Sequence, residues 1–325
     1  MELAADKIGW DRVDQIIEYV NKKKDREHDK KLWTLPEEGV FRIKSDYFTW
    51  GDLTFNPAHA DIFLKDNEVF IDFTKANLCG ISVPGSIKIS STKLELYLYP
   101  VAENRKLDQT VTCHWGEKQL VTGNYNLSGK LFAVSNSKEI GKVLNGNLKF
   151  YAKDGRIYRY GILAKIFALL NVTEIFRGKL PDVVKEGFAY KSIKADGNLE
   201  NVKFMFKKFV IDGSSMTIVC EGYIDLVRDE MDLVVLVSPF KTVDYIIKHI
   251  PLVNHILGGK LVSIPFRVKG NPADPEVIPL SPTAIGAGIF GLLKRTFTLP
   301  VTIIQPLLSD KKDKDTESAI EQIDP

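Results

Sequence analysis

Short runs in which apolar and polar residues alternate constrain this chain more than any other feature of its sequence. Between residues 93 and 99, Leu94, Leu96 and Leu98 alternate with lysine, glutamate and tyrosine. The same period of two recurs at 69–73 and 86–90. Successive side chains of a β-strand point to opposite faces, so each run places its apolar residues on one face. This pattern predicts antiparallel strands with one face exposed to water.

Turn-forming pairs separate these runs at short intervals. Asp66-Asn67, Asp154-Gly155 and Asp212-Gly213 each lie between two apolar runs. An Asp-Gly pair favours a two-residue hairpin, because a type I′ turn needs positive φ at both central residues. Strands joined this way form a meander rather than βαβ crossovers. We therefore expect a mainly β protein built on an antiparallel sheet.

Two apolar segments interrupt the strands and are predicted to be amphipathic helices. They span 161–176 and 241–257, and Pro251 should end or kink the second one. A shorter helical stripe begins at Ile8 and is followed by a charged stretch that we interpret as a linker.

These features divide the chain into four regions. We expect an N-terminal helix and linker at 1–38, a β-rich segment at 39–160, a C-terminal region at 161–308 and a disordered tail at 309–325.

The charge balance and the hydropathy pattern exclude several classes of protein. The 325 residues include 44 Lys and Arg against 42 Asp and Glu, a net charge of +2, which argues against a nucleic-acid-binding protein. The first residues lack the apolar core of a signal peptide, and we find no uncharged apolar run long enough for a transmembrane helix. The sequence is that of a soluble protein, or of a soluble piece of a longer one.

The sequence carries no recognisable catalytic motif. We find no nucleophile elbow, phosphate-binding loop, dinucleotide fingerprint or paired metal-ligand motif. Four carboxylates, Asp225, Asp229, Glu230 and Asp232, cluster at a predicted hairpin, where solvation of the turn explains them better than glycosidase chemistry. We expect no catalytic residues, metal or cofactor; a hydrolase would need convergent carboxylates in a cleft.

The three cysteines leave two alternatives open. Cys79 and Cys113 either pair across neighbouring strands, in an oxidising compartment, or remain buried free thiols. Cys220 alternates with apolar residues and is expected to be a buried thiol.

The second half of the chain resembles the AsmA-like C-terminal region of bacterial envelope proteins. The resemblance runs through LAKIFALLNVTEIFRGKLPDVVKEGFAYKSIKADG at 163–197, FVIDGSSMTIVCEGYIDL at 209–226, and VLVSPFKTVDYIIKHIPLVNHILGGKLVSIPFRVKGNPADPEVIPLSP at 235–282. It closes with GIFGLLKRTFTLP at 288–300, and NLCGISVPG and LVTGNYNLSG are similar to the preceding strands. The long ordered pattern is more specific than any single motif in it.

The resemblance implies a periplasm-facing protein, distantly similar to bridge-like lipid transfer proteins, whose curved sheet forms a groove for lipid tails. It implies a non-enzymatic lipid-handling component of the cell envelope, membrane-associated, between the inner and outer membranes. The alternative is a structural factor for outer-membrane biogenesis that carries no lipid. The expected partners are phospholipid or another membrane lipid, a membrane surface and other envelope proteins. Members of this family usually carry an N-terminal membrane anchor, and since the given sequence shows none, we expect this chain to be the C-terminal part of a longer protein or to have a misplaced start.

If the sheet curls without a partner sheet, its apolar side can line a groove for acyl chains. The alternative is an ordinary core, in which the same residues pack on helices 161–176 and 241–257. The candidate groove residues are Leu94, Leu96, Leu98, Ile218, Ile224, Val262, Ile264 and Phe266.

The stretch 281–308 is apolar and glycine-rich, too interrupted to span a bilayer but apolar enough to lie against one. Two cations within it would meet lipid phosphates. The candidate membrane-surface residues are Ile289, Phe290, Leu292, Leu293, Lys294 and Arg295.

Overall fold

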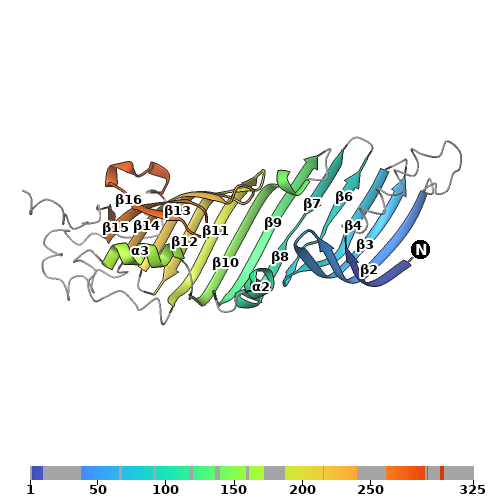
Figure 1. Ribbon diagram of the computed structural model, residues 1–325, viewed down its shortest axis with the longest axis horizontal. Coiled ribbons are helices and arrows are strands. Elements are labelled where there is room, and N and C mark those ends of the chain that lie inside the picture. Colours follow the sequence, from blue (N-terminus) through green and yellow to red (C-terminus); the bar gives the residue numbers. More distant parts are fainter. Residues whose placement is uncertain are drawn as a thin grey trace, which may run out of the picture.

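The alternating runs form the strands of one long, twisted sheet in the computed structural model (Figure 1). The structure describes residues 2–9, 38–65, 68–90, 93–116, 120–135, 140–158, 161–171, 187–214, 216–239, 261–289, 291 and 301–303. The first eight strands are β1 (Glu2–Gly9), β2 (Glu38–Trp50), β3 (Leu53–Lys65), β4 (Glu68–Leu78), β5 (Ile81–Ser82), β6 (Gly85–Ile89), β7 (Leu94–Leu98) and β8 (Val101–Lys106). The others are β9 (Asn124–Ser135), β10 (Asn145–Ile157), β11 (Phe188–Glu200), β12 (Lys203–Gly213), β13 (Met216–Asp225), β14 (Glu230–Pro239), β15 (Leu261–Gly270), β16 (Glu276–Pro279) and β17 (Val301–Ile303).

Few helices accompany the strands. They include α2 (Leu107–Trp115) and α3 (Gly161–Asn171), with 3-10 turns η1 (Ile140–Val143) and η3 (Pro282–Ala284). The predicted mainly β fold is therefore confirmed. The predicted helix at 161–176 is present as far as Asn171. The prediction of a helical stripe from Ile8 was wrong at its start, because Ile8 belongs to β1 and pairs with Phe48 of β2. The rest of that stripe, the predicted helix at 241–257 and the tail 309–325 lie outside the described residues.

Most neighbouring strands are antiparallel, as the meander predicts. From β9 to β16 each strand pairs with the next one along the chain, and no break in the sheet occurs between β10 and β11. The sheet is nevertheless mixed, because β1 runs parallel to β2 and β17 runs parallel to the start of β15.

One of the three predicted turn pairs separates hairpin strands, and the two Asp-Gly predictions were wrong. Lys65 of β3 pairs with Glu68 of β4 on either side of Asp66-Asn67. Asp212-Gly213 forms the end of β12, where Asp212 pairs with Thr217, so the connection to β13 follows this pair. Asp154-Gly155 lies within β10, where Asp154 has a φ of 52°. The positive φ that a type I′ turn also requires is used here for an irregularity inside one long strand.

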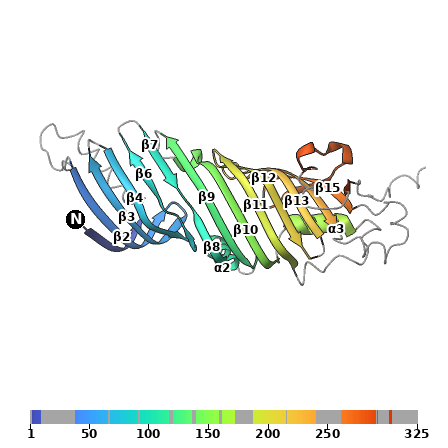
Figure 2. The same cartoon turned by 180° about the vertical axis from the view of Figure 1, so that it is seen from behind.

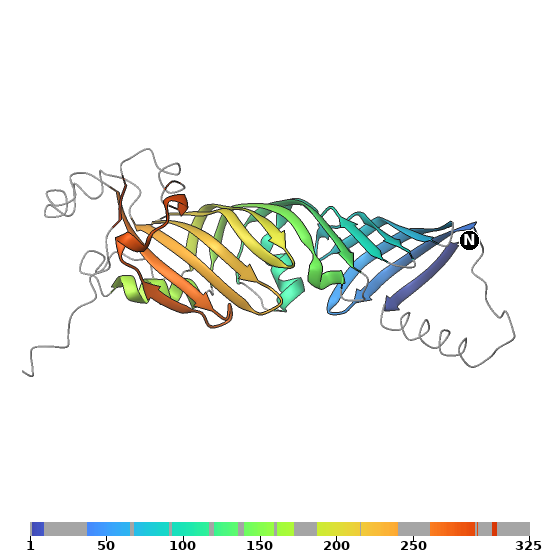
Figure 3. The ribbon, with the colours of Figure 1, turned by 90° about the horizontal axis from the view of Figure 1, so that it is seen from above.

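The strands arch as they cross the sheet, so that one face is enclosed (Figure 3). Comparing the two opposite views shows α3 on the face seen in Figure 1, with the bare strands in front when the molecule is turned (Figure 2). We call the face that carries α3 the inner face.

The inner face of the C-terminal half is filled by α3. The helix buries Ile162, Ile166 and Leu170 against β10 to β15, and the rings of Phe167 and Phe188 lie 5.8 Å apart. A helix with apolar residues on most of its surface needs such an enclosed position. This half of the molecule therefore has a conventional core.

Candidate functional site

At the other end of the sheet, the inner face has no helix among the described residues and leaves an apolar cavity. Its volume is about 220 Å³, and it opens to solvent. All but two of the residues around it, Ser45 and His59, are apolar. The lining comprises Ile8, Ile43, Ser45, Phe48, Trp50, Phe55, Ala58, His59, Ala60, Ile62, Ile71, Phe73, Ala76, Val83, Ile87 and Leu98.

Small side chains create the space in this cavity. Ala58, Ala60 and Ala76 lie on β3 and β4, where larger residues would fill the curve of the sheet. The hydroxyl of Ser45 donates a hydrogen bond to the Tyr47 carbonyl oxygen at 2.8 Å, so this buried polar group is satisfied by its own strand. The cavity therefore offers a ligand an apolar surface with little polar competition.

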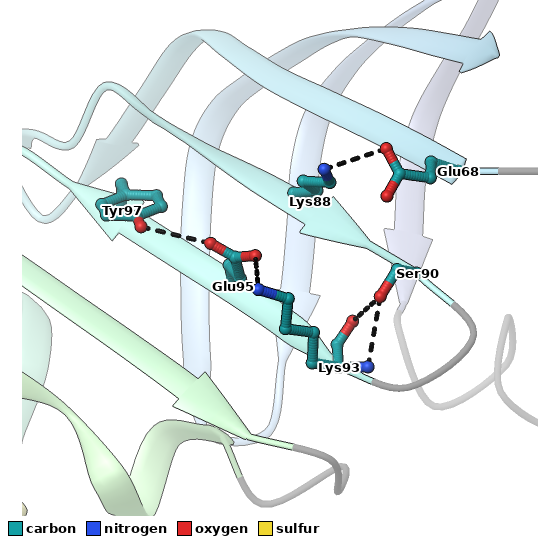
Figure 4. Close-up of polar contacts among 6 residues, drawn as sticks. All are labelled: Glu68, Lys88, Ser90, Lys93, Glu95 and Tyr97. Carbon is teal, nitrogen blue, oxygen red and sulfur yellow. Dashed lines mark hydrogen bonds and ion pairs between the residues drawn. The ribbon is translucent and has the colours of Figure 1, made fainter. Parts of the chain in front are cut away.

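The outer face of the same strands is polar (Figure 4). Lys88 pairs with Glu68 at 2.9 Å, and Lys93 pairs with Glu95 at 2.8 Å. The Tyr97 hydroxyl donates to Glu95 at 3.3 Å. The hydrogen bond and charge of Lys93 lower the pKa of the Glu95 carboxyl. Exposed pairs like these add little stability, but they keep this face in water and direct the apolar face inward.

The inner face is continuous from the cavity to the α3 core. Leu96 of β7 stands opposite Ala133 of β9. Further along β9, Tyr125 stands opposite Ala152 of β10, which in turn faces Ile193 of β11. Because side chains alternate along each strand, these residues share one face. One apolar face thus runs the length of the sheet, open near β1 to β7 and filled near α3.

The groove candidates that belong to the N-terminal half of the chain lie in two different environments. Leu98 lines the apolar cavity. Leu96 is buried in a small core with Ala133 and Ile140, and Leu94 packs against it.

The candidates from the C-terminal half belong to the α3 core. Ile218, Ile264 and Phe266 are buried there, and Ile224 packs against it. Val262 pairs with Thr302 of β17, and its side chain is outside the described set. For these positions the structure has the arrangement of an ordinary core, the alternative that the sequence left open.

Sequence reasoning missed most of the cavity lining. Ile71 and Phe73 carry a clear alternation, but β3 does not, because register shifts interrupt its pairing with β4 between Phe55 and Ala60. The signal that could have identified the cavity is the series of alanines, Ala58, Ala60 and Ala76, among the larger apolar residues of β3 and β4.

One of the candidate membrane-surface residues is described by the structure. Ile289 is fully buried against Val210, Val219 and Leu236 on the outer face, so here it contacts the sheet. The remaining candidates lie outside the described residues, namely Phe290, Leu292, Leu293, Lys294 and Arg295. None of the helices in the described ranges is both long and apolar enough to cross a bilayer.

Cys79 and Cys113 form a disulfide, with their Cα atoms 5.6 Å apart. It joins the turn between β4 and β5 to α2. Cys220 is a buried free thiol, and burial raises its pKa.

The carboxylates at the β13–β14 hairpin have structural contacts. Asp225 accepts hydrogen bonds from the backbone N–H groups of Val227 and Arg228, and Asp232 pairs with Arg267 at 2.6 Å. Within the described ranges no cluster of three or more His, Cys, Asp or Glu side chains could hold a metal ion.

The family model described as YhdP protein matches residues 13–277, more than three quarters of the chain. The chain belongs to the YhdP family. The matched part of this YhdP-family chain includes β2 through β15, and so the α3 core and all of the apolar cavity except Ile8 of β1. No curated protein and no solved structure matches the chain.

Proposed function

We propose that this chain is a non-enzymatic, lipid-handling component of the bacterial cell envelope that holds acyl chains in the apolar cavity of β1 to β7. The observation that carries the proposal is an open, apolar cavity on a sheet whose other face is polar. Membership of the YhdP family and the resemblance to AsmA-like envelope proteins support a periplasm-facing location and a partner membrane.

The energetics favour an acyl chain over a polar ligand in this cavity. Each buried CH₂ group contributes about 0.8 kcal/mol of transfer free energy. A lipid headgroup would find few partners there, because Ser45 is already hydrogen-bonded and the rest of the lining is almost entirely apolar. The headgroup would therefore remain in water at the open side.

A cavity-filling substitution tests the proposal. Ala60→Phe places a ring inside the cavity, whereas Thr74→Phe adds the same ring at an exposed position of β4. We expect phospholipid that co-purifies with the protein, measured by mass spectrometry after extraction, to fall at least fivefold in the first variant only. Equal lipid content in both variants, or wild-type protein that carries no lipid and binds no fluorescent fatty acid, would contradict the proposal.

The second candidate is a structural or assembly factor of the outer membrane that carries no lipid. The filled inner face around α3 favours it, because half of the sheet already has its own core. The lipid measurement above separates the two candidates, since an assembly factor would purify with an empty cavity.

A further inference from the structure

A second cavity, of about 440 Å³, lies between α2 and the ends of β2, β3 and β4. Unlike the apolar cavity, it is lined largely by polar side chains. These are Tyr47, Asp52, Thr54, Asn56, Asn77, Arg105, Lys106, Gln109, Thr110 and His114, next to the disulfide of Cys79 and Cys113.

The two cavities draw on the same strands, β2 to β4, but share no lining residue. Thr54 and Asn56 line the polar cavity, whereas Phe55 between them lines the apolar one. Asn77 and Ala76 divide in the same way on β4. Because the two cavities have no lining residue in common, a ligand in the polar cavity does not occupy the place of an acyl chain.

The walls of the polar cavity are held in place before any ligand binds. The disulfide ties α2 to the β4–β5 turn. Thr110 donates to the Cys79 carbonyl oxygen at 2.9 Å and shares a hydrogen bond with the Tyr125 hydroxyl at 2.8 Å. The Asn77 side chain accepts from the Gly80 N–H at 2.9 Å. A preorganised pocket of this kind loses less conformational entropy on binding.

The polar cavity contains two cations at adjacent positions of the chain. Arg42 and Arg267 each make two hydrogen bonds to an aspartate on the neighbouring strand. Arg105 and Lys106, on adjacent positions at the end of β8, form no ion pair within the part of the chain that the structure describes. A guanidinium presents paired donors that match a phosphate or a carboxylate, and the neighbouring ammonium adds a second charge.

The geometry points to a binding site for a small polyhydroxylated anion, of which a sugar phosphate is the simplest case. Arg105 and Lys106 would hold the anionic group, the amides of Asn56 and Gln109 would bind hydroxyl groups, and the half-exposed ring of Tyr47 offers a flat apolar surface. Phosphate-bearing and carboxylate-bearing sugars share this chemistry. The site is independent of the proposed acyl-chain cavity.

Titration of the whole chain with defined sugars, followed by NMR, tests the inference. The probes are glucosamine 6-phosphate and N-acetylmuramic acid, which separate the two anion types, with neutral N-acetylglucosamine and inorganic phosphate as references. We expect one of the anionic sugars to bind at least tenfold more tightly than either reference. Comparable affinity for all four probes, or no binding by folded protein, would overturn the inference.

Variants locate the site. Arg105→Gln with Lys106→Gln should weaken binding at least tenfold, whereas Lys75→Gln, an exposed lysine of β4 outside the cavity, should leave it unchanged. Removing the disulfide by Cys79→Ser with Cys113→Ser should weaken sugar binding while the lipid content of the apolar cavity stays at the wild-type level. Unchanged sugar affinity in the Arg105 and Lys106 double variant, with its fold verified by circular dichroism, would refute the assignment.

Discussion

Two adjacent residues of β13 illustrate how tightly single positions of this one-layer sheet are constrained. Gly222 has a φ of 126°, and a Cβ atom there would lie 2.1 Å from the carbonyl oxygen of Asp232. Glu221, its neighbour, points to the outer face, where Gly286 and Gly288 lie against its carboxylate. Gly222 is constrained by the geometry of the backbone around it. Glu221 is constrained by the energetic cost of removing water from its charged carboxylate.

Gly222→Ala should be strongly destabilising, because the new methyl group meets backbone that has to move. We expect a loss of more than about 2 kcal/mol in the free energy of unfolding, measured with urea. Gly270→Ala is the matched control, since Gly270 also has a positive φ, of 93°, but no atom lies within 4 Å of its Cβ position. Its expected loss is about 1 kcal/mol, from backbone strain alone. Equal losses in the two variants would show that the close contact is unimportant.

Glu221→Gln should stabilise the protein at neutral pH. Burial raises the pKa of the Glu221 carboxyl, so the folded state disfavours its charged form. The carboxylate therefore costs stability above this pKa, and the cost disappears as the pH falls and the group becomes protonated. The melting temperature of the variant should exceed that of the wild type by about one to two degrees at pH 7, with no difference below about pH 4.

Glu95→Gln is the control for this pH series, because its effect on the melting temperature should have the opposite sign. Lys93 lowers the pKa of Glu95, so the charged form contributes stability that is present at neutral pH and lost in acid. The glutamine variant should melt slightly below the wild type at pH 7. A melting temperature that falls at pH 7 in the Glu221 variant would contradict the burial argument.

At the scale of elements, α3 determines where the inner face is filled. Its apolar side chains meet strands β10 to β15, and Lys165 on its exposed side pairs with Asp274 at 2.6 Å. Ion pairs at such exposed positions contribute little, so the helix is held mainly by its buried side. The core of the C-terminal half depends on this helix being docked.

Ile166→Ala tests that dependence. Ile166 is fully buried, and truncating it should cost about 2–5 kcal/mol of unfolding free energy, from lost transfer energy and the cavity that remains. Lys165→Ala, the adjacent control, should cost less than about 1 kcal/mol. Urea unfolding followed by circular dichroism measures both. A loss below that of the control would mean that α3 is not docked as the structure has it.

Strands and helices were predicted from sequence wherever one local pattern decided the outcome. The leucines of β7 alternate on a partly buried strand, and α3 begins where its apolar run begins. The structure of Asp154-Gly155 could not be predicted from the local sequence, because a residue with positive φ fits a hairpin turn or an irregularity within a strand equally well. The parallel pairing of β1 with β2 was also out of reach, because no residue pattern within β1 specifies its partner.

At the scale of the whole molecule, one apolar face serves two purposes. It is open at β1 to β7 and filled by α3 at the other end. The sequence predicted that such a face would exist but not where it would be open. That depends on which strands α3 reaches and on alanines whose small size leaves space, and neither is visible in an alternation of apolar and polar residues.

Photo-crosslinking should reveal this difference in lipid access between the open and the filled ends of the inner face. A benzophenone amino acid in place of Phe73 faces the apolar cavity, whereas one in place of Phe188 lies in the α3 core. On irradiation in intact bacteria, we expect lipid adducts at least fivefold more abundant at the first position, detected by mass spectrometry of the purified protein. Position Thr74, exposed on β4, sets the background. Equal adducts at Phe73 and Phe188 would mean that α3 leaves the sheet during function.

Strands β2 to β4 each contribute side chains to two chemically different cavities that share no lining residue. Near one end of β3 the contributions come from neighbouring positions: Phe55 lines the apolar cavity, and Thr54 and Asn56 line the polar one. A substitution at one of these positions can alter what one cavity accepts without changing the lining of the other. Two selectivities can thus evolve separately within a single stretch of about a dozen residues per strand.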